Sequence, residues 1–334
     1  MIDPASPAHD YEPAARDALA QFGIVPADIA FVHMSENLTF RVTDARDGGL
    51  LTLRLHRPWY HSIAELHSEH TWTRALVAAG IAAPEPLPTL SGESFARVEV
   101  PATGEHRWAG LARWVDGELL SAVVAREPDP SANARRFADI GAIMAAMHNQ
   151  ATNWTPPPGF ERISLDEDGL MGEHPRWGQF WKHAVLSPAE GAMLLAARDR
   201  LRGALVRYGR VPRGFSLIHA DLHPGNVLVT ARGAAVIDFD DSCFGWHLYD
   251  LAVALVAYQD HPGFAVFRDA CIAGYRSVRP LPDADLALLP MFLLIRDLAQ
   301  LGWFHQRPEL PREAAIRRHR ERILERMPLC DLPI

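Results

Sequence analysis

Three polar side chains between residues 219 and 240 have the types and spacing that metal–phosphate chemistry needs. The segment His219-Ala-Asp-Leu-His-Pro-Gly-Asn226 precedes Val236-Ile-Asp-Phe-Asp240, so Asp221, Asn226 and Asp238 follow one another closely in the chain. Mg²⁺ is commonly held by one or two protein oxygens and completes its octahedron with water and substrate phosphates. Asn226 and Asp238 supply such oxygens, and the pattern therefore indicates phosphoryl transfer.

Two short strands are expected to bring these side chains together. Residues 227–230 and 234–237 are apolar runs separated by a short turn, which predicts a hairpin with Asn226 and Asp238 side by side. Asp221 lies in the loop that enters this hairpin.

The H-x-D-x-x-x-x-N and I-D-F-D blocks resemble the aminoglycoside phosphotransferase and choline kinase-like superfamily, which has a protein-kinase-like fold. Five further segments are similar to the branch that contains stress-response kinase A and the type II homoserine kinases: Ser35-Glu-Asn-Leu-Thr-Phe-Arg41, Leu53-Arg-Leu-His-Arg-Pro58, Ser68-Glu-His-Thr-Trp72, Phe239-Asp-Asp-Ser-Cys-Phe-Gly245 and Tyr249-Asp-Leu-Ala252. The resemblance covers roughly residues 20–305 and identifies the reaction better than the acceptor.

The resemblance implies an α+β, protein-kinase-like fold with two lobes. Residues 1–112 would form a β-rich nucleotide-binding lobe, residues 113–118 a hinge, and residues 119–334 a mainly helical lobe for catalysis and acceptor binding. ATP would bind between the lobes.

The same resemblance assigns roles in the two catalytic blocks. Asp221 would orient and deprotonate an acceptor hydroxyl, while Asn226 and Asp238 hold Mg²⁺. His219 would fix the loop through hydrogen bonds to backbone or to the region of Asp238. His219, Asp221, His223, Asp238 and Asp240 are also compatible with a hydrolytic metal site, but that chemistry does not require the Asn or the hairpin.

Two acidic residues after the hairpin have supporting roles. Asp240 would be a second carboxylate near the metal, an amine contact at the acceptor, or part of a solvated turn. By resemblance, Asp250 anchors the backbone of the catalytic loop; the plainer interpretation is an N-cap residue just before an apolar helix at 251–257.

Candidate nucleotide contacts lie earlier in the chain. Arg54, on a strand at 50–56, stands where the fold normally has a lysine that neutralises phosphate charge, and Glu69, on a helix that begins at Ser62, would aim it. A solvated strand arginine and an exposed helix carboxylate are the plain alternatives. Ser35 and Asn37 occupy the place of a phosphate-covering loop, although the segment has no G-x-G-x-x-G and also fits an ordinary hairpin.

The predicted hinge supplies the last cofactor contacts. Backbone groups of Trp114 and Val115 would hydrogen-bond an adenine edge inside an apolar slot.

Composition sets the outer limits. The chain has 334 residues, 48% of them hydrophobic, and a net charge of −8, which favours a large core and makes a general nucleic-acid surface improbable. Three cysteines imply no disulfide framework, and the N-terminus has no signal-peptide pattern, so we expect a cytoplasmic protein. No stretch is expected to cross a membrane, and the oligomeric state is left open.

The sequence thus predicts an ATP- and Mg²⁺-dependent phosphotransferase that acts on a hydroxyl of a small metabolite, an amino alcohol or an amino acid such as homoserine. A Ser/Thr protein kinase of the stress-response type and an aminoglycoside phosphotransferase are alternatives. A third alternative is a regulatory scaffold that binds nucleotide without transfer. The presence of Asp221 argues against it, because a protein that only binds nucleotide does not need a base.

Overall fold

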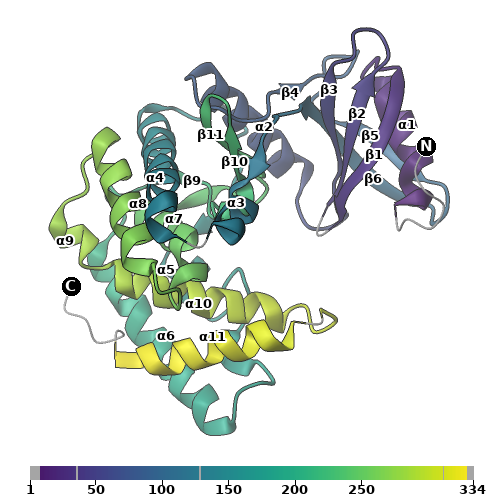
Figure 1. Ribbon diagram of the computed structural model, residues 1–334. Coiled ribbons are helices and arrows are strands. Elements are labelled where there is room, and N and C mark those ends of the chain that lie inside the picture. Colours follow the sequence, from purple (N-terminus) through teal and green to yellow (C-terminus); the bar gives the residue numbers. More distant parts are fainter. Residues whose placement is uncertain (1–7, 35–36, 128, 311, 329–334) are drawn as a thin grey trace. The chain divides into compact units, whose positions relative to one another are not determined.

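The structure, a computed structural model, describes residues 8–34, 37–127, 129–310 and 312–328. It contains two compact units (Figure 1). Unit 1 comprises Met1–Gly117, Pro156–Arg162 and Ala235–Asp240, and unit 2 comprises Glu118–Thr155, Ile163–Ala234 and Asp241–Ile334. Two short segments from beyond residue 155 therefore belong to unit 1, and one of them carries Asp238.

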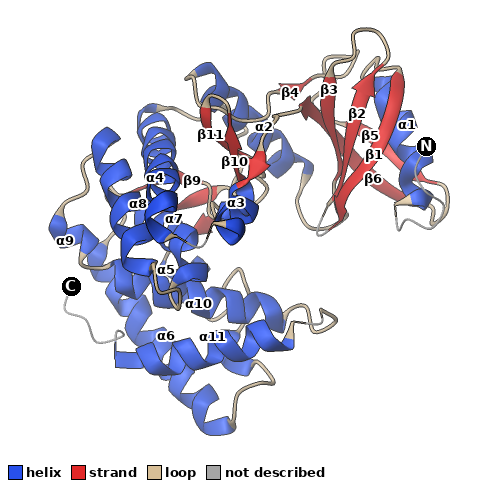
Figure 2. Ribbon diagram, viewed as in Figure 1, coloured by secondary structure: helices blue, strands red, loops and turns tan. Residues whose placement is uncertain are grey.

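An antiparallel sheet makes up most of unit 1, and Figure 2 shows its strands in red. The strands are β1 (Pro26–Met34), β2 (Leu38–Asp44), β3 (Leu50–Leu55), β4 (Pro86–Leu87), β5 (Ala96–Val100) and β6 (Glu105–Arg113), in the order β1-β2-β3-β6-β4 with β5 also paired to β6. The helical elements are η1 (His9–Tyr11), α1 (Glu12–Gln21) and α2 (Ile63–Ala78). Ser62 and Glu65 form a reciprocal capping box at the start of α2, as their spacing predicts.

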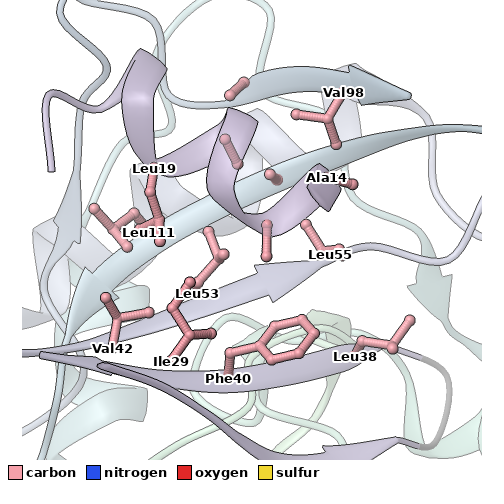
Figure 3. Close-up of a cluster of buried hydrophobic side chains, with 14 of the residues drawn as sticks. Ala14, Leu19, Ile29, Leu38, Phe40, Val42, Leu53, Leu55, Val98 and Leu111 are labelled. Atoms are coloured by element: carbon pink, nitrogen blue, oxygen red, sulfur yellow. The ribbon is translucent and has the colours of Figure 1, made fainter. Parts of the chain in front are cut away.

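The core of unit 1 lies between α1 and one face of this sheet (Figure 3). Phe40, Leu53 and Leu55 are fully buried there against α1 residues such as Leu19. Burial of each large apolar side chain contributes about 1.5–3 kcal/mol. Because strand side chains alternate between faces, burial of Leu53 and Leu55 in this core directs Arg54 to the opposite face.

Unit 2 is mainly helical (Figure 2). Its helical elements are α3 (Leu120–Arg126), α4 (Pro130–Asn153), α5 (Glu167–Met171), η2 (Phe180–Lys182), α6 (Pro188–Tyr208), η3 (Pro224–Asn226), α7 (His247–Leu255), η4 (Val256–Tyr258), α8 (Phe264–Val278), α9 (Asp283–Leu286), α10 (Leu289–His305) and α11 (Glu313–Arg326). Its strands form two small sheets, one of β11 (Gly233–Val236), β10 (Val227–Thr230) and β7 (Glu118–Leu119), the other of β8 (Ser164–Leu165), β12 (Cys243–Trp246) and β9 (Phe215–Ile218). The boundary between the units falls within β11.

Helix α6 begins at Pro188 because Ser187 and Glu190 form a capping box, a signal that the sequence analysis did not use. Strand β6 stops at Arg113, the first residue of the predicted hinge.

One helical stretch, Asp283–His305, is long and apolar enough to cross a membrane by length and composition. The structure buries 72% of its most apolar window. That degree of burial is typical of a core helix, and α10 accordingly packs against α7 and α11 in unit 2.

Candidate active site

The loop that carries Asp221 is held in unit 2 by a buried carboxylate. Asp250 is fully buried, and its two oxygens accept hydrogen bonds from the backbone N–H groups of Ala220 (2.7 Å) and His219 (2.9 Å). Ala220 has a φ of 65°, a left-handed conformation that costs a residue with a Cβ about 1–2 kcal/mol. The bonds to Asp250 offset this cost. Burial raises the pKa of Asp250 to about 6, against the opposing effect of its partners in the loop.

Asp250 lies inside α7, whose N-cap is Trp246, so the N-cap alternative is wrong. The helix begins four residues earlier than predicted, and the carboxylate points to another segment instead of its own helix end. His148 on α4 also reaches it, with Nε2 3.2 Å from Asp250 Oδ2.

The carboxylate of Asp221 has partners on both oxygens. Arg296 Nη2 donates to Oδ1 at 2.7 Å, and Asn226 Nδ2 donates to Oδ2 at 3.0 Å. His223 Nε2 lies 3.4 Å from the same Oδ2. Burial opposes ionisation, but the contact with His223 and the charge of Arg296 prevail and lower the pKa of Asp221. The group is therefore ionised at neutral pH and able to accept a hydrogen bond.

Asn226 is oriented in a way that suits a metal ligand. Its Nδ2 donates to the backbone oxygen of Asp221 at 2.9 Å as well as to that residue's side chain. An amide whose nitrogen is fixed in this way presents its Oδ1 elsewhere. No side chain or backbone donor of the described residues bonds Asn226 Oδ1, which leaves this oxygen for a hard cation.

In unit 1, Arg54 connects two carboxylates. Its Nη1 lies 3.3 Å from Glu69 Oε1 on α2, and its Nη2 lies 3.0 Å from Asp238 Oδ1. Asp238 has a φ of 66°, one of three positive values among the described residues other than glycine, and its side chain is 44% exposed. Strained backbone of this kind concentrates at functional sites. Burial raises the pKa of Glu69 to about 7, although the charge of Arg54 opposes the shift.

Asp240 is buried beside one arginine and two histidines rather than in a solvated turn. Arg54 Nη1 is 3.9 Å and His61 Nε2 3.5 Å from its carboxylate, and His56 Nδ1 is 3.8 Å away. Burial lowers the pKa of His56 to about 3. Burial also acts to lower the pKa of His61. The hydrogen bond from His61 to Asp240 has the larger effect, and the pKa of His61 is raised.

The remaining predicted nucleotide contacts are placed as follows. Asn37 is buried and its Oδ1 accepts the Arg57 N–H at 2.9 Å, which ties the β1–β2 turn to the end of β3. The Trp114 N–H donates to the Leu50 carbonyl at 3.0 Å, so an adenine contact at Trp114 would use its backbone carbonyl. Ser35 lies outside the described residues.

His219 is fully buried, and its Nδ1 accepts the backbone N–H of Asp221 at 3.3 Å. This is the backbone contact that the sequence analysis expected of it. Within the described ranges, no three His, Cys, Asp or Glu side chains are grouped closely enough to hold a metal by themselves.

Sequence reasoning missed the contact between Arg296 and Asp221. The sequence does contain a signal for such a contact. Arg296 and Asp297 are charged residues within the mainly apolar helix α10, and buried charges need partners. Sequence reasoning also missed the pairing of His61 with Asp240.

Comparison with known proteins agrees with the fold and with these blocks. Residues 29–285 match the family model described as the phosphotransferase enzyme family. A solved structure of a microcompartment-associated aminopropanol kinase is 32% identical, covers 96% of this chain and 95% of its own, and has a TM-score of 0.77. An amicoumacin kinase solved with AMP-PNP and Ca²⁺ is 22% identical with a TM-score of 0.78 and covers 97% and 96% of the two chains. The homoserine kinase of Rhizobium rhizogenes (strain K84) is 28% identical over 76% of this chain and 72% of its own.

These similarities, with the antiparallel sheet and the helical unit, define a phosphotransferase of protein-kinase-like α+β fold. The chain belongs to the phosphotransferase enzyme family, and it is a small-molecule kinase of that family. The predicted fold class and enzyme class are confirmed.

Proposed function

We propose that the protein transfers the γ-phosphoryl group of ATP, with Mg²⁺, to the hydroxyl of a small amine-bearing metabolite, an amino alcohol or an amino acid such as homoserine. The observation that carries the proposal is the fixed carboxylate of Asp221 on a loop anchored by Asp250. The similarity to an aminopropanol kinase at 32% identity and to homoserine kinases supports the acceptor class.

Each predicted residue has one task in this proposal. Asp221 orients the acceptor hydroxyl and accepts its proton, and Arg54, aimed by Glu69, binds phosphate oxygens. The oxygens of Asn226 and Asp238 would hold Mg²⁺, which when bound neutralises charge that develops on the transferred group. Asn37, Trp114 and Val115 remain proposed nucleotide contacts, as does Ser35. We also propose a cytoplasmic setting, where ATP and reduced thiols are available.

The proposal is tested by ATP consumption with Mg²⁺ against amino alcohols, amino acids, sugars, aminoglycosides and a generic protein substrate. Turnover is expected with one of the first two classes. Turnover with an aminoglycoside or with the protein alone would favour those alternatives, and ATP binding without turnover on any acceptor would favour the scaffold.

Asp221→Asn is the first variant to make. It keeps the shape of the side chain but cannot accept the proton, so kcat should fall by about 10²–10⁴-fold while ATP binding is retained. The measurement is acceptor-dependent turnover together with nucleotide titration. Unchanged turnover would remove the central claim.

Metal dependence belongs to the same test. Chelation with EDTA should abolish turnover, and Mg²⁺ should restore it. In Asp238→Ala, where one oxygen ligand is missing, the Mg²⁺ concentration for half-maximal turnover should rise. An unchanged Mg²⁺ requirement would exclude Asp238 as a ligand.

A further inference from the structure

A buried arginine projects from an apolar helix toward the catalytic loop. Arg296 lies in the middle of α10, and only 8% of the residue is exposed. A guanidinium removed from water costs several kcal/mol unless it is paired and hydrogen-bonded. The partners of this group therefore explain what it does.

The partners of Arg296 are Asp221, the predicted base, and Tyr249, the residue next to the loop anchor Asp250. Arg296 Nη2 donates to Asp221 Oδ1 at 2.7 Å, and Nη1 donates to the hydroxyl of Tyr249 at 3.3 Å. Tyr249 is fully buried and directly precedes Asp250 on α7. Two consecutive residues of α7 thus fix the loop. The Asp250 carboxylate accepts hydrogen bonds from the loop backbone, and Tyr249 contacts Arg296, which binds the carboxylate of Asp221.

The two donors also determine which way the carboxylate faces. Arg296 occupies Oδ1 and Asn226 Nδ2 occupies Oδ2, so rotation of the Asp221 carboxylate would break both bonds. A carboxylate has about four acceptor positions, and those that remain can still receive a hydroxyl. Errors in the orientation of a reacting group of about 1 Å can cost 10²-fold in rate.

We propose that Arg296, supported by Tyr249, is a positioning residue that holds the carboxylate of Asp221 in the orientation that accepts the proton of the acceptor hydroxyl. The inference rests on the proposed function, in which Asp221 is the base. Arg296 need not contact either substrate to play this part.

A buried arginine on the neighbouring helix α11 provides a matched control. Asp297, which follows Arg296 on α10, is fully buried and pairs with Arg322 of α11 at 2.6 Å. Arg322 is 4% exposed, so it is a buried arginine of the same kind that joins α10 to α11 without contact to Asp221. Its loss should lower stability and leave the geometry of the catalytic loop unchanged.

The experiment compares kcat, the KM for ATP and thermal unfolding in Arg296→Gln, Arg296→Lys and Arg322→Gln. Arg296→Gln should lower kcat by about 10²-fold with an unchanged KM for ATP, because orientation and not binding is lost. Arg296→Lys should regain part of the rate, since one ammonium can reach Asp221 but cannot bond Asp221 and Tyr249 as a planar fork does. Arg322→Gln should unfold at a lower temperature and keep its kcat. Wild-type kcat in Arg296→Gln, or an equal loss in Arg322→Gln, would overturn the inference.

A double-mutant cycle with Asp221→Asn shows whether Arg296 acts through the base. If it does, Arg296→Gln costs little further rate in the Asp221→Asn background. An equal loss in both backgrounds would overturn the inference, because Arg296 would then act independently of Asp221. Full turnover in Asp221→Asn would overturn the proposed function and this inference with it, whereas the other contrary outcomes overturn the inference alone.

Discussion

At the scale of single residues, the cation on β3 differs most from the pattern of the wider superfamily. Arg54 holds its charge on a planar fork, and this fork spans Glu69 and Asp238 at 3.3 and 3.0 Å. A lysine has a compact ammonium that would contact fewer partners at once. The fork therefore lets one side chain contact both carboxylates.

We therefore expect Arg54→Met to lower kcat/KM for ATP by about 10²-fold, as removal of one charged donor from an active site commonly does. Arg54→Lys should retain more activity than Arg54→Met because it keeps the charge. The measurement is steady-state kinetics at varied ATP. Equal activity of Arg54→Met and the wild type would show that Arg54 has no part in nucleotide binding.

At the scale of elements, the packing of α4 against α8 holds a histidine that contacts Asp250, the anchor of the catalytic loop. Both ring nitrogens of His148 on α4 have partners, Asp250 at 3.2 Å and the hydroxyl of Tyr275 on α8 at 3.0 Å. The two helices approach closely because glycines lie at their crossing. A Cβ on Gly141 would come within 1.9 Å of the Cys271 carbonyl oxygen, and neither backbone can move aside cheaply.

Gly141→Ala should therefore lower the free energy of unfolding by about 1–3 kcal/mol or more, since overpacking forces the helices apart. Gly203→Ala on α6 is the matched control. Its new Cβ would meet only the end of the Arg207 side chain at 3.5 Å, so the exchange should raise stability by about 0.5–1 kcal/mol through helix propensity. Chemical denaturation measures both. Equal stability of the two variants would contradict the close helix crossing.

At the scale of the whole molecule, buried histidines should make the protein sensitive to mild acid. Burial lowers the pKa of His56 and His148 to about 3 and lowers that of His70 and His247. A histidine whose folded pKa is lowered contributes stability above its unfolded pKa of about 6.5 and loses it as the pH falls. Two buried carboxyl groups, Asp250 and Glu69, have raised pKa values and act in the opposite sense. Four histidines outweigh two carboxyl groups.

Stability should accordingly fall between pH 6 and pH 4.5, by about 2.7 kcal/mol per pH unit, from two net protons at about 1.36 kcal/mol each. Denaturant unfolding at several pH values measures this slope. His70→Phe keeps an aromatic ring stacked on Phe95 and removes one titrating group. The slope of stability against pH should therefore decrease by about 1.4 kcal/mol per pH unit. A stability that is constant across this range would show that the buried histidines accept protons without cost.

The sequence by itself determined the fold class, the enzyme class and the order of the catalytic blocks. The capping box at Ser62 and the apolar runs around Asn226 are local signals, because a cap or a hairpin depends on residues a few positions apart. The start of α6 at Pro188 carried an equally local signal that was overlooked.

Only the tertiary structure decided which side chains meet. Arg296 reaches Asp221 across 75 positions of sequence, and Asp250 bonds Ala220 across 30. Such contacts depend on how helices pack, and helix periodicity shows that a face is buried but not what lies opposite it. A charged residue in an apolar helix indicates a buried partner, since an unpaired buried charge would lower the stability by several kcal/mol. Which partner it has is settled by packing alone.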